Sequence, residues 1–246
     1  MNARKLMARL NASTVRFDVG RGGLPELTPQ DVAGALGFVK DEFAREVFCA
    51  IWWPDGAAIS RQSLNDRLRA MLLEEFARRC RQSEVARLEY HLAQANFEAR
   101  RVHSRSDRAE LARLAEQKTE ADRERWPGEM AIYPQIAYGV LAELVSSNQC
   151  GRCGGRGVGL DGMVVVTCPK CDGRGSASSN DVRRATLIGK EPSAYRKTWA
   201  RVYEWLYDKA ASAESTAAKL ISRQLDPSSA ADVTPPLLPC TLGKVA

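Results

Sequence analysis

One short pattern of cysteine and glycine occurs twice near the middle of the 246-residue chain, and it constrains the fold more than any other feature. The first copy begins at Cys150 and reads CGRCGGRG, and the second begins at Cys168 and reads CPKCDGRG. Each copy is a CxxCxGxG pattern, and fourteen residues separate the two cysteine pairs. A single CxxC is weak evidence, but two at this spacing are typical of a small metal-binding ribbon.

We expect the four cysteines, Cys150, Cys153, Cys168 and Cys171, to bind one structural Zn²⁺ ion. Four thiolates close a tetrahedral site and leave no open position, so a catalytic zinc is not expected. The glycines after each pair permit positive φ, which lets backbone amides point back at the sulfur atoms. A dithiol redox site and a disulfide-bonded pair are alternative interpretations of the same spacing.

The residues between the two cysteine pairs predict a β-hairpin. Met163 to Thr167 is rich in β-branched residues and predicts one strand, which follows a turn near Asp161 and Gly162. So few apolar side chains cannot hold a hairpin together. We therefore expect metal binding to supply the stability of residues 150–175.

The chain before the cysteines predicts a helical domain, residues 28–149, which follows a flexible arm, residues 1–27. Thr28 and Pro29 suit the first positions of a helix. The helices expected in this domain cover residues 30–37, 41–53, 61 onward and 132–145.

Two segments of the long helical region differ in pattern. After Arg61 the apolar residues recur at spacings of three and four, which predicts one apolar helical face. This face consists of Leu64, Leu68, Met71, Leu72, Phe76, Val85, Leu88 and Leu92. In residues 104–125, by contrast, 12 of the 22 side chains are charged, and only Leu111 and Leu114 are apolar beyond alanine. That composition predicts an exposed helix or coiled-coil arm.

Residues 176–225 predict a helical module, and residues 226–246, which contain four prolines, predict a disordered tail. The expected helices cover residues 181–188, 192–210 and 213–225, the last with Ser212 as its cap. Two helices joined at Gly189 have the layout of a helix-turn-helix, whose second helix enters the major groove of DNA. The chain is thus expected to be mainly α-helical, with a small zinc-ribbon hairpin inserted before a helix-turn-helix-like C-terminal module.

Positive charge is concentrated in the last two-fifths of the chain. Residues 1–149 carry 22 basic and 21 acidic side chains, whereas residues 150–246 carry 14 and 9. Such an excess favours a polyanionic partner, and we predict that the C-terminal module binds double-stranded DNA. A plain helical hairpin with a solvated basic face is the alternative. The predicted DNA-binding residues are Arg183, Arg184, Lys190, Arg196, Lys197 and Arg201.

Membrane and enzymatic functions are disfavoured. The most apolar window, Ala131 to Val145, is interrupted by Pro134 and Glu143 and is too short to span a bilayer. We therefore expect a soluble cytoplasmic protein without a membrane partner. The chain has two histidines, and no set of acid, base and nucleophile stands out, so we do not expect an enzyme.

In combination, these segments resemble the Q-type late-gene antitermination proteins of lambdoid phages. The resemblance covers roughly residues 27–225. It includes the LTPQDV helix start at Leu27, the double cysteine pattern and the sequence WARVYEWLYD from Trp199 to Asp208. The charged arm has no clear counterpart in that family. The connection over residues 188–199 is longer than the family pattern, which leaves open which side chains of the second helix face DNA bases.

The resemblance implies a regulator of transcription. Proteins of this family bind DNA that overlaps a phage late promoter and engage bacterial RNA polymerase paused just downstream with its sigma factor still bound. They then travel with the polymerase and let it pass terminators. The resemblance places this activity in the cytoplasm of a bacterial host. From the charge distribution we infer that the basic C-terminal region binds DNA and that the near-neutral helical N-terminal region is available for polymerase or for self-association.

Two other functions are compatible with parts of the sequence. A zinc-dependent DNA-binding regulator that does not travel with polymerase would carry the same motifs. A DnaJ-like zinc module is less favoured, because DnaJ-type proteins carry four such repeats and a His-Pro-Asp tripeptide. This chain has two repeats, and neither His91 nor His103 precedes a proline.

Overall fold

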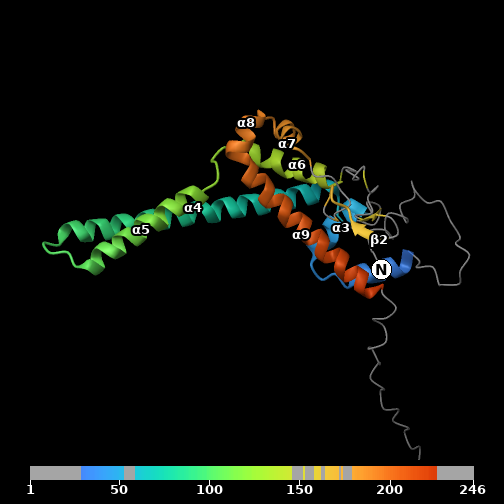
Figure 1. The fold of residues 1–246 in the computed structure, drawn as a ribbon, viewed down its shortest axis with the longest axis horizontal. Coiled ribbons are helices and arrows are strands. Elements are labelled where there is room, and N and C mark those ends of the chain that lie inside the picture. Colours follow the sequence, from blue (N-terminus) through green and yellow to red (C-terminus); the bar gives the residue numbers. More distant parts are fainter. Residues whose placement is uncertain are drawn as a thin grey trace, which may run out of the picture. The chain divides into compact units, whose positions relative to one another are not determined.

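The computed structural model describes residues 29–52, 59–145, 152, 158–161, 164–171, 173 and 179–225. These residues are mainly α-helical, as the sequence predicts (Figure 1). The chain divides into two compact units, one of residues 1–58 and 210–246 and the other of residues 59–209. The predicted flexible arm and the predicted disordered tail lie outside the described residues. No helix among those described combines the length and apolarity needed to cross a membrane.

The first unit contains three helical segments that share one core. They are α2 (Pro29–Gly37), α3 (Glu42–Trp52) and the C-terminal part of α9 (Ala200–Gln224). Apolar side chains from all three segments pack together, and the buried members are Ala35, Leu36, Val39, Ala44, Phe48, Cys49, Ala217, Ala218, Ile221 and Leu225. Beside this core the indole N–H of Trp52 donates a hydrogen bond to the carboxylate of Glu214 at 2.8 Å. Helices α2 and α3 are thus stabilised by the C-terminal part of α9.

The helix α9 is continuous, which corrects the expectation of two helices separated near Ser212. The carbonyl of Ser212 accepts a hydrogen bond from the hydroxyl of Thr216 at 2.9 Å, inside the helix. Serine competes only weakly with helix formation, and no glycine or proline interrupts this stretch. The C-terminal part of α9 packs with α2 and α3 in the first compact unit. The division between the two units within α9 therefore falls at residue 210, whereas the sequence places the start of the C-terminal module at residue 176.

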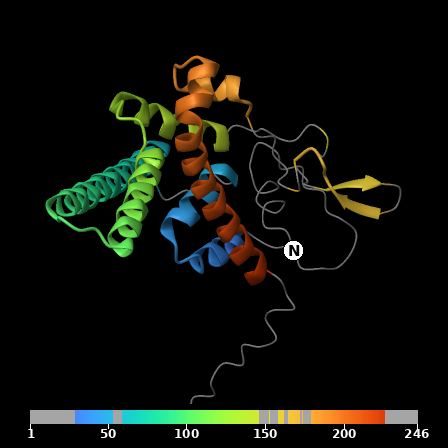
Figure 2. The ribbon, with the colours of Figure 1, turned by 60° about the vertical axis from the view of Figure 1, so that its left-hand side comes forward.

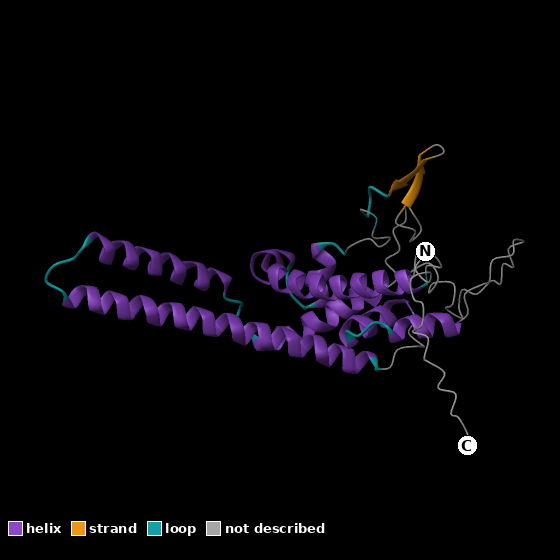
Figure 3. Ribbon diagram, turned by 90° about the horizontal axis from the view of Figure 1, so that it is seen from below, coloured by secondary structure: helices purple, strands orange, loops and turns teal. Residues whose placement is uncertain are grey.

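In the second unit, α4 (Arg61–Ala99) and α5 (Arg105–Glu124) run side by side in opposite directions (Figure 3). Leu114 of α5 is buried, and polar contacts also join the two helices. The carboxylate of Asp122 accepts hydrogen bonds from the hydroxyl of Ser83 at 2.7 Å and from the guanidinium of Arg87 at 2.8 Å. The charged segment is therefore an exposed two-helix arm, as its composition predicts.

The apolar face of α4 is buried over only half of its length. Near the start of α4 it packs against α6, but along the arm it faces solvent. Leu64, Leu68 and Leu72 are at most 1% exposed, whereas Val85, Leu88 and Leu92 are 52%, 63% and 65% exposed. The periodicity predicts the face correctly, but a repeat of three and four residues does not reveal where the neighbouring helix ends.

The remaining helical elements of the second unit pack around aromatic side chains. These elements are η2 (Met130–Ile132), α6 (Tyr133–Val145), α7 (Asp181–Leu187), α8 (Pro192–Ala194), the π-helical turn η3 (Tyr195–Trp199) and the first turns of α9. The ring of Tyr133 meets Phe76 and Trp199 edge-on, with centroids 5.3 and 5.9 Å apart. Trp199, Tyr203 and Leu206 of this group are buried.

A two-stranded antiparallel hairpin lies between α6 and α7 in the sequence (Figure 2). Its strands are β1 (Val158–Asp161) and β2 (Val164–Thr167). Val158 pairs with Thr167 and Asp161 pairs with Val164. The structure confirms the strand predicted from the β-branched residues and shows that it pairs with an antiparallel neighbour. The strands alone do not identify the hairpin as a zinc ribbon.

Candidate metal centre and nucleic-acid interface

The second cysteine pair forms a tight turn directly after β2. The backbone N–H of Cys171 donates to the carbonyl of Cys168 at 3.3 Å, and both residues are 1% exposed. Gly173 follows with φ 80°, a conformation that strains any residue with a side chain. The glycine pattern after this pair therefore corresponds to an actual backbone requirement.

This turn has the chemistry that zinc requires. Two thiol groups three residues apart and shielded from water can supply two of the four thiolates of a tetrahedral site. The other two predicted ligands, Cys150 and Cys153, lie outside the described residues. Within the part of the chain that the structure describes, no group of three or more His, Cys, Asp or Glu is placed to hold a metal ion. The described cysteines thus fit one half of the predicted site.

A buried carboxylate ties the segment after the cysteines to the helices. Glu143 on α6 accepts a hydrogen bond from the backbone N–H of Ser179 at 3.1 Å. The next residue, Asn180, caps α7 by accepting from the N–H of Arg183 at 2.9 Å. The start of α7 is therefore positioned by α6, close in sequence to the cysteine turn.

Glu143 also binds two side chains of the second unit. The guanidinium of Arg184 donates to both carboxylate oxygens, each at 2.9 Å, and the hydroxyl of Tyr203 donates to one of them at 2.9 Å. Glu143 and Arg184 are 3% and 8% exposed. This bidentate arrangement joins α6, α7 and α9 through charge-assisted hydrogen bonds.

Protonation states follow from this geometry. Burial alone lowers the pKa of Arg184, but the hydrogen bonds and the charge of Glu143 more than offset it, so the pKa is raised. Burial, and then the charge of Glu143, raise the pKa of Tyr203 well above its usual range. Arg184 is therefore charged, and Tyr203 keeps the proton that it donates to the carboxylate.

Sequence reasoning missed Glu143 and Tyr203 as parts of one polar network. A signal was present, because Glu143 is the only charged residue in the apolar helix α6. A lone carboxylate in such a helix requires a buried cationic or hydrogen-bonding partner. The sequence does not identify that partner, since Arg184 lies 41 residues away.

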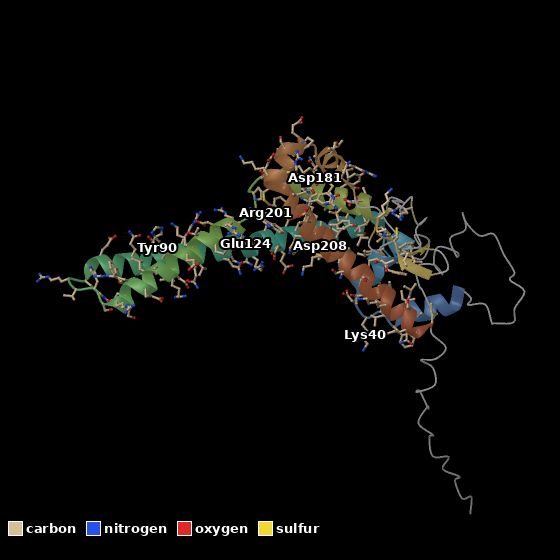
Figure 4. The ribbon with its side chains drawn as sticks, viewed as in Figure 1. Lys40, Tyr90, Glu124, Asp181, Arg201 and Asp208 are labelled. Atoms are coloured by element: carbon tan, nitrogen blue, oxygen red, sulfur yellow. The ribbon has the colours of Figure 1, made fainter. Side chains whose placement is uncertain are left out.

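Three of the predicted DNA-binding residues are engaged within the protein. Arg184 is buried on Glu143, as described above. Lys190 forms an ion pair with Glu129 at 2.8 Å and is half-buried. The guanidinium of Arg201 donates to the backbone carbonyls of Arg123 and Arg125, beside the end of α5 (Figure 4). Arg184 is buried and unavailable for DNA, and Lys190 and Arg201 are bound to other groups of the protein, so the interface proposed below omits all three.

The other three predicted residues, Arg183, Arg196 and Lys197, are exposed. Arg183 lies on α7, and Arg196 and Lys197 lie on η3, after the turn at Gly189. Gly189 has φ 65°, which allows the chain to reverse between the two helices. Arg196 and Lys197 form no ion pair with any residue in the described ranges.

No protein-family model matches the chain, and no curated protein matches it significantly. Function is therefore inferred from the residues and their geometry.

Proposed function

We propose that the protein is a DNA-binding transcription antiterminator. It binds duplex DNA near a phage late promoter, loads onto bacterial RNA polymerase paused with its sigma factor, and lets that polymerase pass terminators. It acts in the host cytoplasm and catalyses no reaction of its own. The exposed cationic group around the Gly189 turn, consisting of Arg183, Arg196 and Lys197, supports the DNA binding. The sequence resemblance to the Q-type proteins supports the antitermination.

In this proposal the cysteines have a structural role. Cys150, Cys153, Cys168 and Cys171 hold one Zn²⁺ ion, which when bound supplies a cross-link between the two CxxC turns. The hydrogen bond from Ser179 to Glu143 then connects the end of this segment to α6.

The exposed cations provide DNA affinity. Lysine and arginine neutralise backbone phosphates and release counterions, so binding weakens as salt rises. An arginine can in addition donate two hydrogen bonds to guanine in the major groove. Arg183 and Arg196, on the two sides of the turn, are the candidates for base contacts.

The region before the cysteines contacts polymerase in this proposal. Residues 1–149 carry 22 basic and 21 acidic side chains, so this region as a whole has almost no net charge. A separate protein-binding region is what antitermination requires, because the protein must stay with polymerase after it leaves the promoter DNA.

A transcription assay tests the function. Purified bacterial RNA polymerase holoenzyme transcribes a template that carries a phage late promoter and a downstream terminator, with and without the protein. We expect the fraction of full-length transcripts to rise when the protein is present. Unchanged termination despite demonstrated DNA binding would identify instead a zinc-dependent regulator that does not travel with polymerase.

A pair of charge-matched variants tests the interface. Arg196→Ala with Lys197→Ala removes two of the proposed phosphate contacts, which should lower the slope of log affinity against log salt by about 1 to 2. Lys219→Ala with Arg223→Ala removes the same charge from exposed positions near the end of α9 and should leave the slope unchanged. Equal effects of the two variants would contradict the assignment of the interface.

A further inference from the structure

The end of the two-helix arm carries a second concentration of positive charge. The segment that we call the arm tip, residues 100–108, joins α4 to α5 and contains four arginines and one acid, Asp107. We infer that the arm tip binds the phosphate backbone of duplex DNA, at a site separate from the cationic group around Gly189. This inference rests on the proposed DNA binding but not on antitermination.

The acid in the arm tip is fully engaged by its neighbours. The carboxylate of Asp107 accepts hydrogen bonds from the backbone N–H and the hydroxyl of Ser104, at 2.9 and 2.8 Å, and forms an ion pair with Arg100. Arg101, Arg105 and Arg108 are exposed and pair with no acid in the described part of the chain. The tip therefore presents three uncompensated positive charges.

The position of these arginines disfavours a purely stabilising role. Arg105 and Arg108 lie in the first turns of α5, where the helix dipole favours acids and repels cations. Their charge therefore costs α5 some stability while it raises the positive potential at the tip. Binding to a polyanion accounts for this arrangement, because arginine pairs with phosphate through two parallel hydrogen bonds.

The arm tip is ordered before any partner binds. The ring of His103 stacks on Phe97 with centroids 3.8 Å apart and an angle of 12° between the planes. Ser104 and Asp107 form a reciprocal capping box at the start of α5. A preorganised loop loses less entropy on binding than a mobile one, so three arginines suffice for a measurable contribution.

The same stacking favours duplex over single-stranded nucleic acid. Single strands are bound chiefly by aromatic rings on which the bases stack. Phe97 and His103 are the rings nearest to the arginines in sequence, and they stack on one another. Apart from the exposed Val102, the side chains that the tip presents to solvent are mainly charged, which matches the regular phosphates of a duplex.

The arm length separates this contact from the helical core of the second unit. Leu72 is the last fully buried leucine of α4, and the helix continues for 27 residues to Ala99. At 1.5 Å per residue this distance is about 40 Å, or about 12 base pairs of DNA. The arm points away from α6 and α7 (Figure 1), so the tip can reach phosphates that those helices do not.

The test measures binding of the full chain to a 40-base-pair duplex of arbitrary sequence at several salt concentrations. The tip variant replaces Arg101, Arg105 and Arg108 with alanine. The shaft variant replaces three other exposed arginines of the arm, Arg81, Arg113 and Arg123, and so loses the same charge. Circular dichroism verifies that both variants keep the helical content of the wild type.

We expect the tip variant to lower the slope of log affinity against log salt by about 2 to 3, since each phosphate contact contributes about 0.9. Its affinity should fall at least about tenfold, while the shaft variant stays within about twofold of the wild type. Replacement of the same three arginines by lysine should retain the slope, because the contact is with phosphate charge.

Three results would overturn the inference. Equal slopes for wild type and tip variant would exclude a phosphate contact at the tip and leave the proposed function intact. Tighter tip-dependent binding to a single-stranded RNA of 40 nucleotides than to the duplex would identify RNA as the partner. No binding of the wild type to promoter DNA or to the arbitrary duplex would contradict both this inference and the proposed function.

Discussion

The guanidinium of Arg184 and the carboxylate of Glu143 form two hydrogen bonds of 2.9 Å between α7 and α6. Their side chains are 9% and 1% exposed, so almost no water screens the pair. Arg183, the preceding residue, is exposed. Two adjacent arginines thus differ completely in role, and a double replacement of both would mix a loss of folding with a loss of binding.

The buried pair predicts a large difference between single variants. Glu143→Ala leaves the charge of Arg184 buried without compensation and should lower the free energy of unfolding by about 3 to 5 kcal/mol. Arg183→Ala, on the surface, should change it by less than about 0.5 kcal/mol. Urea denaturation of both variants measures this. Similar stabilities would show that Glu143 and Arg184 are not paired in solution.

The cysteine site predicts a metal stoichiometry. Cys171→Ser or Cys153→Ser should lose the bound zinc, because an incomplete tetrahedral site holds the ion poorly. Cys80→Ser, on α4 and half-buried, is the control and should keep one zinc ion per chain. Elemental analysis of the purified proteins gives the ratio. A Cys171→Ser protein with a full equivalent of zinc would exclude this ligand set.

The two halves of the apolar face on α4 predict opposite sensitivities. Leu72 is fully buried, and Leu72→Ala should cost about 2 to 5 kcal/mol, because it leaves a cavity. Leu88 is 63% exposed, and Leu88→Ala should cost less than about 0.5 kcal/mol. Thermal unfolding at equal protein concentration compares them. A comparable loss at Leu88 would mean that another surface covers the arm.

The carboxylates of the arm predict sensitivity to acid. Hydrogen bonds from Ser104 lower the pKa of Asp107, and the hydroxyl of Ser83 lowers that of Asp122, from the usual 3.8. A folded-state pKa below the unfolded value means that the stabilisation is complete at neutral pH. It is lost as the pH falls below about 4 and through the folded-state pKa.

Hydrogen exchange of α5 at decreasing pH measures this effect once the intrinsic exchange rates are corrected. We expect protection of α5 to fall as the pH drops below about 4, and to fall less in a variant with Asp107→Asn and Asp122→Asn. Identical acid profiles for the variant and the wild type would show that these carboxylates do not stabilise the arm.

Local signals in the sequence account for several features of the fold. Asn180 caps α7, Gly189 takes a positive φ, and Pro192 begins the next helix. Each of these features depends on the backbone preferences of one residue and its nearest neighbours along the chain, so a short window contains the necessary information. The two-helix arm was predictable for a related reason, since its charge density excludes a core position.

Other features depend on which segments meet in space. The same leucine periodicity is buried at Leu72 and exposed at Leu88, because α6 covers only the first part of α4. Arg184 and Arg183 are indistinguishable by composition, and only the buried Glu143 on another helix separates them. The sequence determined the helices, the turns and the cysteine pattern through local backbone energetics. Tertiary structure decided which charged and apolar side chains are buried, because burial depends on neighbours distant in the chain.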